Sequence, residues 1–172
     1  MAFCSQSGAI GAAVLNSLRE TEIRFGQFIS VGNKADVNEN DLLEYWQDCK
    51  DVSVITYYLE SFVDGEKFIK YFIDDRITKP IIVLKGGRTS SGIKAASSHT
   101  GALGGSDKVV DAILTQFGII RADDLNDMFN TAKGFEDFPM PKGNQVAIVT
   151  NAGGPAILTV DTLEKNNLVL AE

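Results

Sequence analysis

The segment Gly86–Gly105 contains the residue types that suit chemistry on a phosphoryl group: many Ser, Thr and Gly residues, two cations and the only histidine of the chain, His99. Small residues let backbone N–H groups approach an oxyanion, and the cations Arg88 and Lys94 add positive charge. A neutral imidazole can accept a phosphoryl group if one ring nitrogen attacks while the other holds the proton. A lone histidine is more often structural, but Ser98–Gly101 offers no apolar face for a core residue, which favours catalysis.

The tautomer of such a histidine is usually fixed by an acceptor, most often a carboxylate. Glu60 is the candidate, because it ends a predicted strand and so lies at the sheet edge from which Gly86–Gly105 starts. A helix-capping or solvent-exposed Glu before Ser61 is the alternative, and position alone leaves it open.

Two short turns have the composition of anion sites, and each follows an apolar strand and precedes a predicted helix. The first contains Ser5, Gln6, Ser7 and Gly8, and the second contains Asn151, Ala152, Gly153 and Gly154. Free N–H groups at a helix N-terminus attract an anion. The similarity of 4–8 to 149–153 is a weak internal repeat. The alternative is that any such turn favours small residues.

The elements that must position these residues alternate between strand and helix. Strands are predicted at 1–4, 28–31, 52–59, 80–84 and 118–121, with helices at 9–19, 41–49 and 66–77 and beginning at 106 and near 125. This order predicts an α/β fold, a parallel sheet with helices on both faces. The segment 86–105, expected as a long loop, then leaves the carboxyl end of a strand, where ligands bind in such sheets.

The pattern divides the chain into a first domain at 1–134, a Pro-containing linker at 135–143 and, at 144–172, the incomplete beginning of a second similar domain. The first strand has almost nothing before it, so the start is expected to be clipped as well.

Composition excludes several classes of protein. The net charge is −7 without any Lys/Arg run, which argues against nucleic acid and anionic membrane as partners. Neither a transmembrane run nor a signal peptide is recognisable. Cys4 and Cys49 stand far apart, so we expect a reduced, cytoplasmic setting and no metal site.

Several stretches together resemble the ADP-forming acetyl-CoA synthetases, which are relatives of succinyl-CoA synthetase, and the resemblance covers nearly the whole chain. The matching stretches are Ser5–Gly11, Val31–Val37, Tyr58–Glu60, Leu84–Arg88, Ser98–Asp107 and Thr150–Pro155. The run Ser-His-Thr-Gly-Ala-Leu joined to Asn-Ala-Gly-Gly-Pro is specific.

The resemblance implies a flavodoxin-like fold and an acid–thiol ligase that converts acyl-CoA, ADP and phosphate into the free acid, ATP and CoA. An acyl phosphate would phosphorylate His99, Glu60 would hold the ring, and the two turns would cradle the phosphoryl group. The loop residues Lys85, Arg88, Ser98, Thr100 and Gly101 would surround it. For Lys85 and Arg88, solvated loop charges remain the alternative.

The resemblance also implies partners. The family's CoA-binding and ATP-grasp domains have no counterpart in these 172 residues, so they are expected as partner domains or subunits. We expect no tightly bound cofactor: the CoA thioester, phosphate and ADP or ATP would be substrates, with Mg²⁺ held beside the nucleotide on the other domains. The chain alone is expected to be inactive. Two alternatives stay open: a non-catalytic phosphate-binding or acyl-CoA-sensing module, as in acetyltransferase fusions, and a CoA-dependent transferase without nucleotide chemistry.

Overall fold

The sheet of the first unit, Met1–Phe138, has five parallel strands in the order β2-β1-β3-β4-β5 in a computed structural model. The structure describes residues 1–21, 23–100 and 106–171, with only the backbone described for 18–21 and 96–100. The strands are β1 (Ala2–Ser5), β2 (Gln27–Ser30), β3 (Ile55–Leu59), β4 (Ile81–Lys85) and β5 (Ile120–Ala122). Ala2 of β1 pairs with Gln27 on one side and Ile55 on the other. The sequence-based prediction of a parallel, flavodoxin-like sheet is confirmed.

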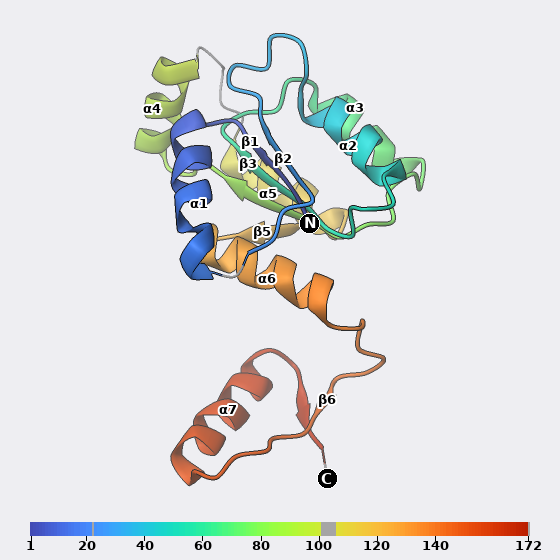
Figure 1. Ribbon diagram of the computed structural model, residues 1–172, viewed down its shortest axis with the longest axis vertical. Coiled ribbons are helices and arrows are strands. Elements are labelled where there is room, and N and C mark those ends of the chain that lie inside the picture. The colour runs from blue at the N-terminus through green and yellow to red at the C-terminus, as the bar shows by residue number, and fades with distance from the viewer. Residues whose placement is uncertain (22, 101–105, 172) are drawn as a thin grey trace. The chain divides into compact units, whose positions relative to one another are not determined.

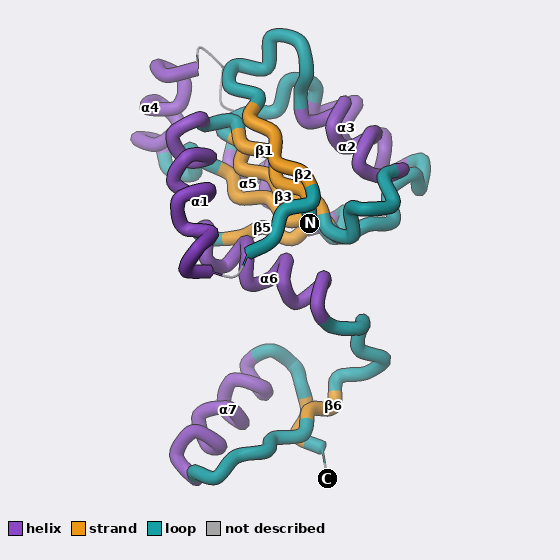
Figure 2. The backbone as a smooth tube through the Cα atoms, in the orientation of Figure 1, coloured by secondary structure: helices purple, strands orange, loops and turns teal. Residues whose placement is uncertain are grey.

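Helices cover both faces of this sheet (Figure 1). On one face, α1 (Gly8–Thr21) and α6 (Leu125–Asp137) pack through Val14, Met128 and Phe129. The opposite face carries α2 (Glu39–Asp48), α3 (Gly65–Ile73) and α5 (Asp107–Gln116). A further helix, α4 (Ser90–Thr100), lies between β4 and α5 in the chain (Figure 2).

Alternate residues of the central strands enter two separate cores, because successive side chains of a strand point to opposite faces. In β1, Phe3 packs on the α1–α6 side, while Ala2 and Cys4 pack on the other. Phe3 forms edge-on ring contacts with Phe28 and Phe129, with ring centroids 5.3 Å apart in both pairs. Buried aromatic groups of this size dominate the stability of such a core.

The start of α2 is fixed by a capping box. The side chain of Asn38 accepts from the backbone N–H of Asn40 at 2.9 Å, and that of Asp41 accepts from Asn38 N at 3.1 Å. Leu43 and Trp46 of this helix are fully buried against the sheet. The cap and the apolar face together determine where the helix begins and how it lies.

The strand order reverses direction between β1 and β3, since the chain first moves outward to β2 and then returns across β1. In open parallel sheets, ligands bind at the carboxyl ends of the strands at such a switch point. The residues that follow β1, β3 and β4 are therefore brought to one edge.

The second unit, Pro139–Glu172, contains β6 (Gln145–Val146), α7 (Gly153–Lys165) and β7 (Val169–Leu170). Its two strands pair in parallel, as expected for a βαβ unit. Val149, Ile157 and Leu158 are exposed in it. That residues 144–172 begin a further domain stays a prediction.

Two sequence-based expectations about local structure are wrong. Residues 90–100, expected as part of a long loop, form α4, whose first turn is capped by the Oγ1 of Thr89, which accepts from Gly92 N at 3.0 Å. Helix α6 continues to Asp137, into the stretch 135–143 that was expected to be linker. Residues 90–100 are rich in Ser, and Pro139 and Pro141 follow the end of α6, so the composition of both segments favoured loop over helix.

Candidate functional site

The carboxyl edge of the sheet gathers most of the site residues expected in the first unit. Ser5 ends β1, Glu60 follows β3 and Lys85 ends β4, and these three strands are neighbours in the order β1-β3-β4. Leu59, immediately before Glu60, is paired with Lys85 in the sheet. The structure therefore brings the predicted carboxylate, one predicted turn and one predicted cation together.

The turn between β1 and α1 is organised by its two serines. Ser5 Oγ donates to Ser7 O at 2.7 Å and accepts from Ser7 N at 3.2 Å. Ser7 Oγ accepts from Ile10 N at 3.3 Å, and α1 begins at Gly8 with no acidic residue in its first turn. The partial positive charge of this helix N-terminus is thus not neutralised by a neighbouring carboxylate in that turn.

Gln6, in the same turn, has a side chain that binds protein backbone. Its buried side chain accepts from the backbone N–H groups of Glu60 at 2.8 Å and Ser61 at 3.1 Å. Its Nε2 donates to Ser61 Oγ at 3.2 Å. The side chain of Gln6 thus fixes the backbone of the segment that carries Glu60, and the assignment of its turn to phosphate stays a prediction.

Lys85 is also buried rather than a solvated loop charge. Its ammonium donates to Glu60 O at 2.6 Å and to Gly86 O. Burial lowers the pKa of Lys85 below its usual value, while Asp107 and Glu60 oppose the shift. The cation therefore supports the backbone beside Glu60 and adds positive potential to this edge.

The Glu60 carboxylate lies beside Tyr58, whose Oη donates to Glu60 Oε1 at 3.4 Å. Burial, followed by the charge of Glu60 and this hydrogen bond, raises the pKa of Tyr58 to about 12. A Cβ on Gly86 would lie 3.0 Å from Tyr58 Oη and 3.5 Å from Glu60 Cγ. Glycine at this position therefore leaves room for the phenol and the carboxylate.

An ion pair that sequence reasoning missed lies next to this segment. Lys34 Nζ is 2.9 Å from Glu39 Oε2, and both side chains are almost completely buried. Lys34 Nζ also donates to Ser61 O, and Glu39 Oε1 accepts from Val63 N at 2.6 Å. Lysine and glutamate are expected on the surface, so composition gave no signal for them. The stretch 31–37 was noted only as part of the resemblance.

A cavity of about 590 Å³ opens at the same edge, between the end of β4 and the start of α6. Tyr58, Gly86 and Arg88 are among its lining residues. Arg88 is not a lone loop charge, because it forms an ion pair with Asp123 at 2.6 Å. Tyr58, the hydrogen-bond donor to Glu60, thus connects this cavity to the edge where Glu60 lies.

His99 belongs by its backbone to α4, the helix that follows this edge (Figure 1). The side chains of Ser98, His99 and Thr100, and all of Gly101, lie outside the described residues. The predicted contact of His99 with Glu60 therefore stays a prediction.

The second predicted turn repeats the hydrogen bonding of the first within the second unit. Thr150 Oγ1 donates to Ala152 O at 3.3 Å and accepts from Ala152 N at 3.2 Å, as Ser5 does with Ser7. Asn151, Ala152, Gly153 and Gly154 are exposed, and α7 begins at Gly153. The internal repeat noted in the sequence thus extends to backbone geometry, although the two turns belong to different units.

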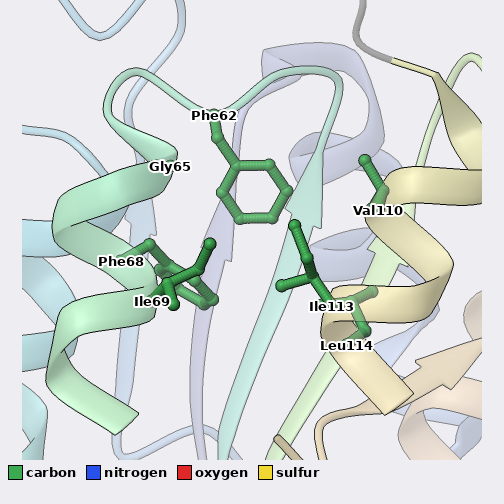
Figure 3. A pocket seen from close by; sticks show the side chains of 7 residues that line it. All are labelled: Phe62, Gly65, Phe68, Ile69, Val110, Ile113 and Leu114. Carbon is green, nitrogen blue, oxygen red and sulfur yellow. The ribbon is translucent and has the colours of Figure 1, made fainter. Parts of the chain in front are cut away.

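Other regions offer less chemistry. A cavity of about 50 Å³ between α3 and α5 is lined by apolar groups, including Phe62, Phe68 and Val110 (Figure 3). Among residues 1–21, 23–100 and 106–171, no group of three or more His, Cys, Asp or Glu side chains is arranged to hold a metal. Within the same part of the chain, no helix has the length and apolar character needed to cross a membrane.

Comparisons with known proteins agree with the fold of the first unit. Residues 1–135 match the protein family described as succinyl-CoA ligase like flavodoxin domain. The chain is 45% identical, over 99% of its length, to the acetate–CoA ligase [ADP-forming] II subunit alpha of Pyrococcus furiosus, covering 37% of that protein. It is 43% identical to the 4-hydroxybutyrate–CoA ligase [ADP-forming] of Nitrosopumilus maritimus, covering 25% of it.

A solved structure shows the same likeness. Acetyl-coenzyme A synthetase 1 of Ca. Korarchaeum cryptofilum, described as dinucleotide forming and in complex with phosphate and ADP, superposes with a TM-score of 0.90 at 37% identity. The match covers 99% of this chain and 37% of that one. The chain therefore spans between a quarter and somewhat over a third of the relatives named here.

Proposed function

Because this chain belongs to the succinyl-CoA ligase like flavodoxin domain family, we propose that it is the phosphohistidine-carrying part of an ADP-forming acyl-CoA synthetase. In this proposal His99 takes up and passes on a phosphoryl group, and Glu60 holds its imidazole. Residues 144–172 begin a second flavodoxin-like domain. Homology to ADP-forming acyl-CoA ligases over nearly the whole chain supports the proposal.

The observation that carries the proposal is the fixed position of Glu60 at the switch-point edge. Gln6 and Lys85 bind the backbone of Glu60, and the N-terminus of α1 starts beside the same strand end. Helix α4, which carries His99, follows β4 and leaves this edge after Gly86. A carboxylate, a helix N-terminus and a histidine-bearing helix thus share one edge.

The chemistry proceeds in three displacements. Phosphate attacks the thioester carbonyl of acyl-CoA, forming an acyl phosphate and releasing the CoA thiolate. One imidazole nitrogen of His99 then attacks phosphorus, so the P–O bond to the acyl carboxylate breaks and the free acid leaves. ADP finally takes the phosphoryl group from His99, which regenerates the neutral ring and yields ATP.

The protein's contribution is positioning and electrostatics. A carboxylate on the non-attacking ring nitrogen fixes the tautomer and stabilises the positive charge that the ring acquires. The free N–H groups of α1 would face the phosphoryl oxygens. Lys85 adds positive potential at the same edge without contacting the group itself.

The remaining parts of the reaction are assigned to partner domains or subunits that bind CoA and the nucleotide. The chain covers only 37% of the related alpha subunit. In this proposal Mg²⁺ accompanies the nucleotide on those partner domains, and we expect no sustained ATP formation from acetyl-CoA, ADP and phosphate by these 172 residues alone.

The test is direct labelling of the chain with ³²P-acetyl phosphate. We expect one phosphoryl group per chain, labile in acid and stable in alkali, as is typical of phosphohistidine. His99→Ala should abolish the label, and Glu60→Gln should slow labelling because the tautomer is no longer held. Label that persists in His99→Ala would disprove the assignment. An unlabelled chain that still binds phosphate would instead identify a non-catalytic phosphate-binding module.

A further inference from the structure

We propose that Lys34 and Glu39 are positioning residues for Glu60, acting through the backbone of residues 61–63. The inference rests on the proposed function, since it assigns to the pair a role in phosphoryl transfer to His99. Neither residue touches the reacting groups in this proposal. Their effect is to hold the segment that carries the carboxylate.

Lys34 is directed inward by its backbone. It has a positive φ of 57°, unusual for a residue with a side chain, and its N–H donates to Val31 O at 3.0 Å. This turn places the ammonium in the interior, where its side chain is 1% exposed. Because a strained backbone and a buried charge both cost free energy, we infer that the surrounding contacts fix the conformation of Lys34 and the position of its ammonium.

Both members of the pair use their remaining hydrogen-bonding capacity on one short segment. Lys34 Nζ bonds Glu39 Oε2 at 2.9 Å and also donates to Ser61 O. Glu39 Oε1 accepts from Val63 N at 2.6 Å. The carboxylate thus bridges between the lysine and a backbone amide three residues after Glu60.

The pair completes a set of four side chains that bind the backbone of residues 60–63. Gln6 binds the N–H groups of Glu60 and Ser61, and Lys85 binds the carbonyl of Glu60. Lys34 and Glu39 take the next groups, at Ser61 and Val63. In the part of the chain that the structure describes, no strand pairs with residues 61–63, so side chains replace the ladder hydrogen bonds that fix β3.

Stability alone does not account for such a pair. Removing two charges from water costs about as much as their attraction returns, and apolar replacement of both partners is often neutral or stabilising. What apolar side chains cannot replace is the hydrogen bonding to Ser61 O and Val63 N. The specific contribution of the pair is therefore the position of the segment.

The decisive variant is Lys34→Met/Glu39→Leu, which removes both charges and keeps apolar bulk. Its matched control is Arg76→Met/Glu44→Leu, because that ion pair is also at 2.9 Å but is about half exposed on both sides. Two readouts are measured for each: amide hydrogen exchange, and the rate of ³²P labelling by acetyl phosphate across donor concentrations.

We expect the double variant to fold and to exchange the amides of Glu60, Ser61 and Val63 at least about tenfold faster. Its labelling rate at saturating donor should fall by roughly 10- to 100-fold, the scale expected for a displacement near 1 Å. The half-saturating donor concentration should change little, because the N-terminus of α1 is untouched. The control variant should retain wild-type values in both readouts.

Three results would overturn the inference: unchanged exchange at these amides, an unchanged labelling rate, or an equal loss in the control. Amide exchange does not depend on catalysis. A wild-type chain that is not labelled would therefore reject the proposed function, while its exchange rates would still test whether Lys34 and Glu39 fix residues 60–63.

If the double variant fails to fold, the wild-type chain itself provides the test. Val63 is 55% exposed, yet its amide donates to a buried carboxylate, whereas Lys67 N donates to the exposed cap Asp64 at 2.9 Å. Exchange at Val63 should be at least tenfold slower than at Lys67. Equal exchange at both amides would refute the proposal.

Discussion

Gln6 provides the sharpest test of how the site is held, because one side-chain oxygen serves two backbone donors. In Gln6→Ala, the N–H groups of Glu60 and Ser61 lose the acceptor that lies 2.8 Å and 3.1 Å away. The side chain of Gln6 is 5% exposed, so its removal leaves a gap that is largely closed to water.

A buried donor left without a partner costs about 1–3 kcal/mol. The two donors share one oxygen and their bonds are only partly buried, so water can reach part of the gap. We therefore expect the low end, about 2 kcal/mol for the pair. For a protein of this size that corresponds to a fall in Tm of roughly 4–8 °C.

Urea unfolding followed by tryptophan fluorescence measures this loss. The single tryptophan, Trp46, is buried in the first unit and therefore reports on that unit. Gln6→Ala should lower the midpoint while leaving the m-value unchanged.

The control is Gln47→Ala. Gln47 also accepts from a backbone N–H, that of Thr78 at 3.2 Å, and donates to a hydroxyl at 2.8 Å, but both bonds are exposed. Water replaces these partners, so the expected loss is at most about 0.5 kcal/mol. Equal losses for the two variants would show that Gln6 does not stabilise this edge.

Two further predictions concern Tyr58 and its surroundings. Gly86→Ala should lower the free energy of unfolding in urea by about 1–3 kcal/mol, because the new Cβ meets Tyr58 Oη. Gly8→Ala should change it little, because the space around Gly8 is open. The phenol should titrate near pH 12 by NMR of ¹³C-labelled tyrosine, and Glu60→Gln should lower that pKa only in part, since burial is the larger cause. Because the folded pKa exceeds the usual value of about 10, the stability that neutral Tyr58 contributes is complete below pH 10. It is lost as the pH rises towards 12, and Tyr58→Phe should show a smaller loss than the wild type, because buried groups such as Cys4 and Tyr57 also resist ionisation.

The sheet could be predicted because its central strands are short apolar runs, such as Ile81–Leu84, that end in Gly or polar residues. That Glu60 lies at the sheet edge from which residues 86–105 start followed from strand ends alone. Helix α4 could not be recognised from an apolar face, because Ile93 is its only large apolar side chain. The signal that could have found it is Thr89 followed by Lys94, Ala95 and Ala96, a cap before good helix formers.

The roles of individual polar residues were harder to predict than their places. Gln6 was assigned to phosphate because it lies in a turn, but its side chain binds protein backbone. Lys34 and Glu39 gave no signal, since a buried pair is distinguished from a surface pair only by packing between distant elements. Sequence spacing locates a strand end, whereas the partner of a side chain depends on tertiary structure.

The side chains that bind residues 60–63 have a consequence for protein engineering. They come from Gln6, Lys34, Glu39 and Lys85, which are spread over some eighty positions of the chain. Transplanting the strand end with its glutamate into another parallel sheet would carry none of them. A working graft would have to import three neighbouring connections together, so the smallest transferable part of this edge is a set of adjoining βα junctions rather than a linear motif.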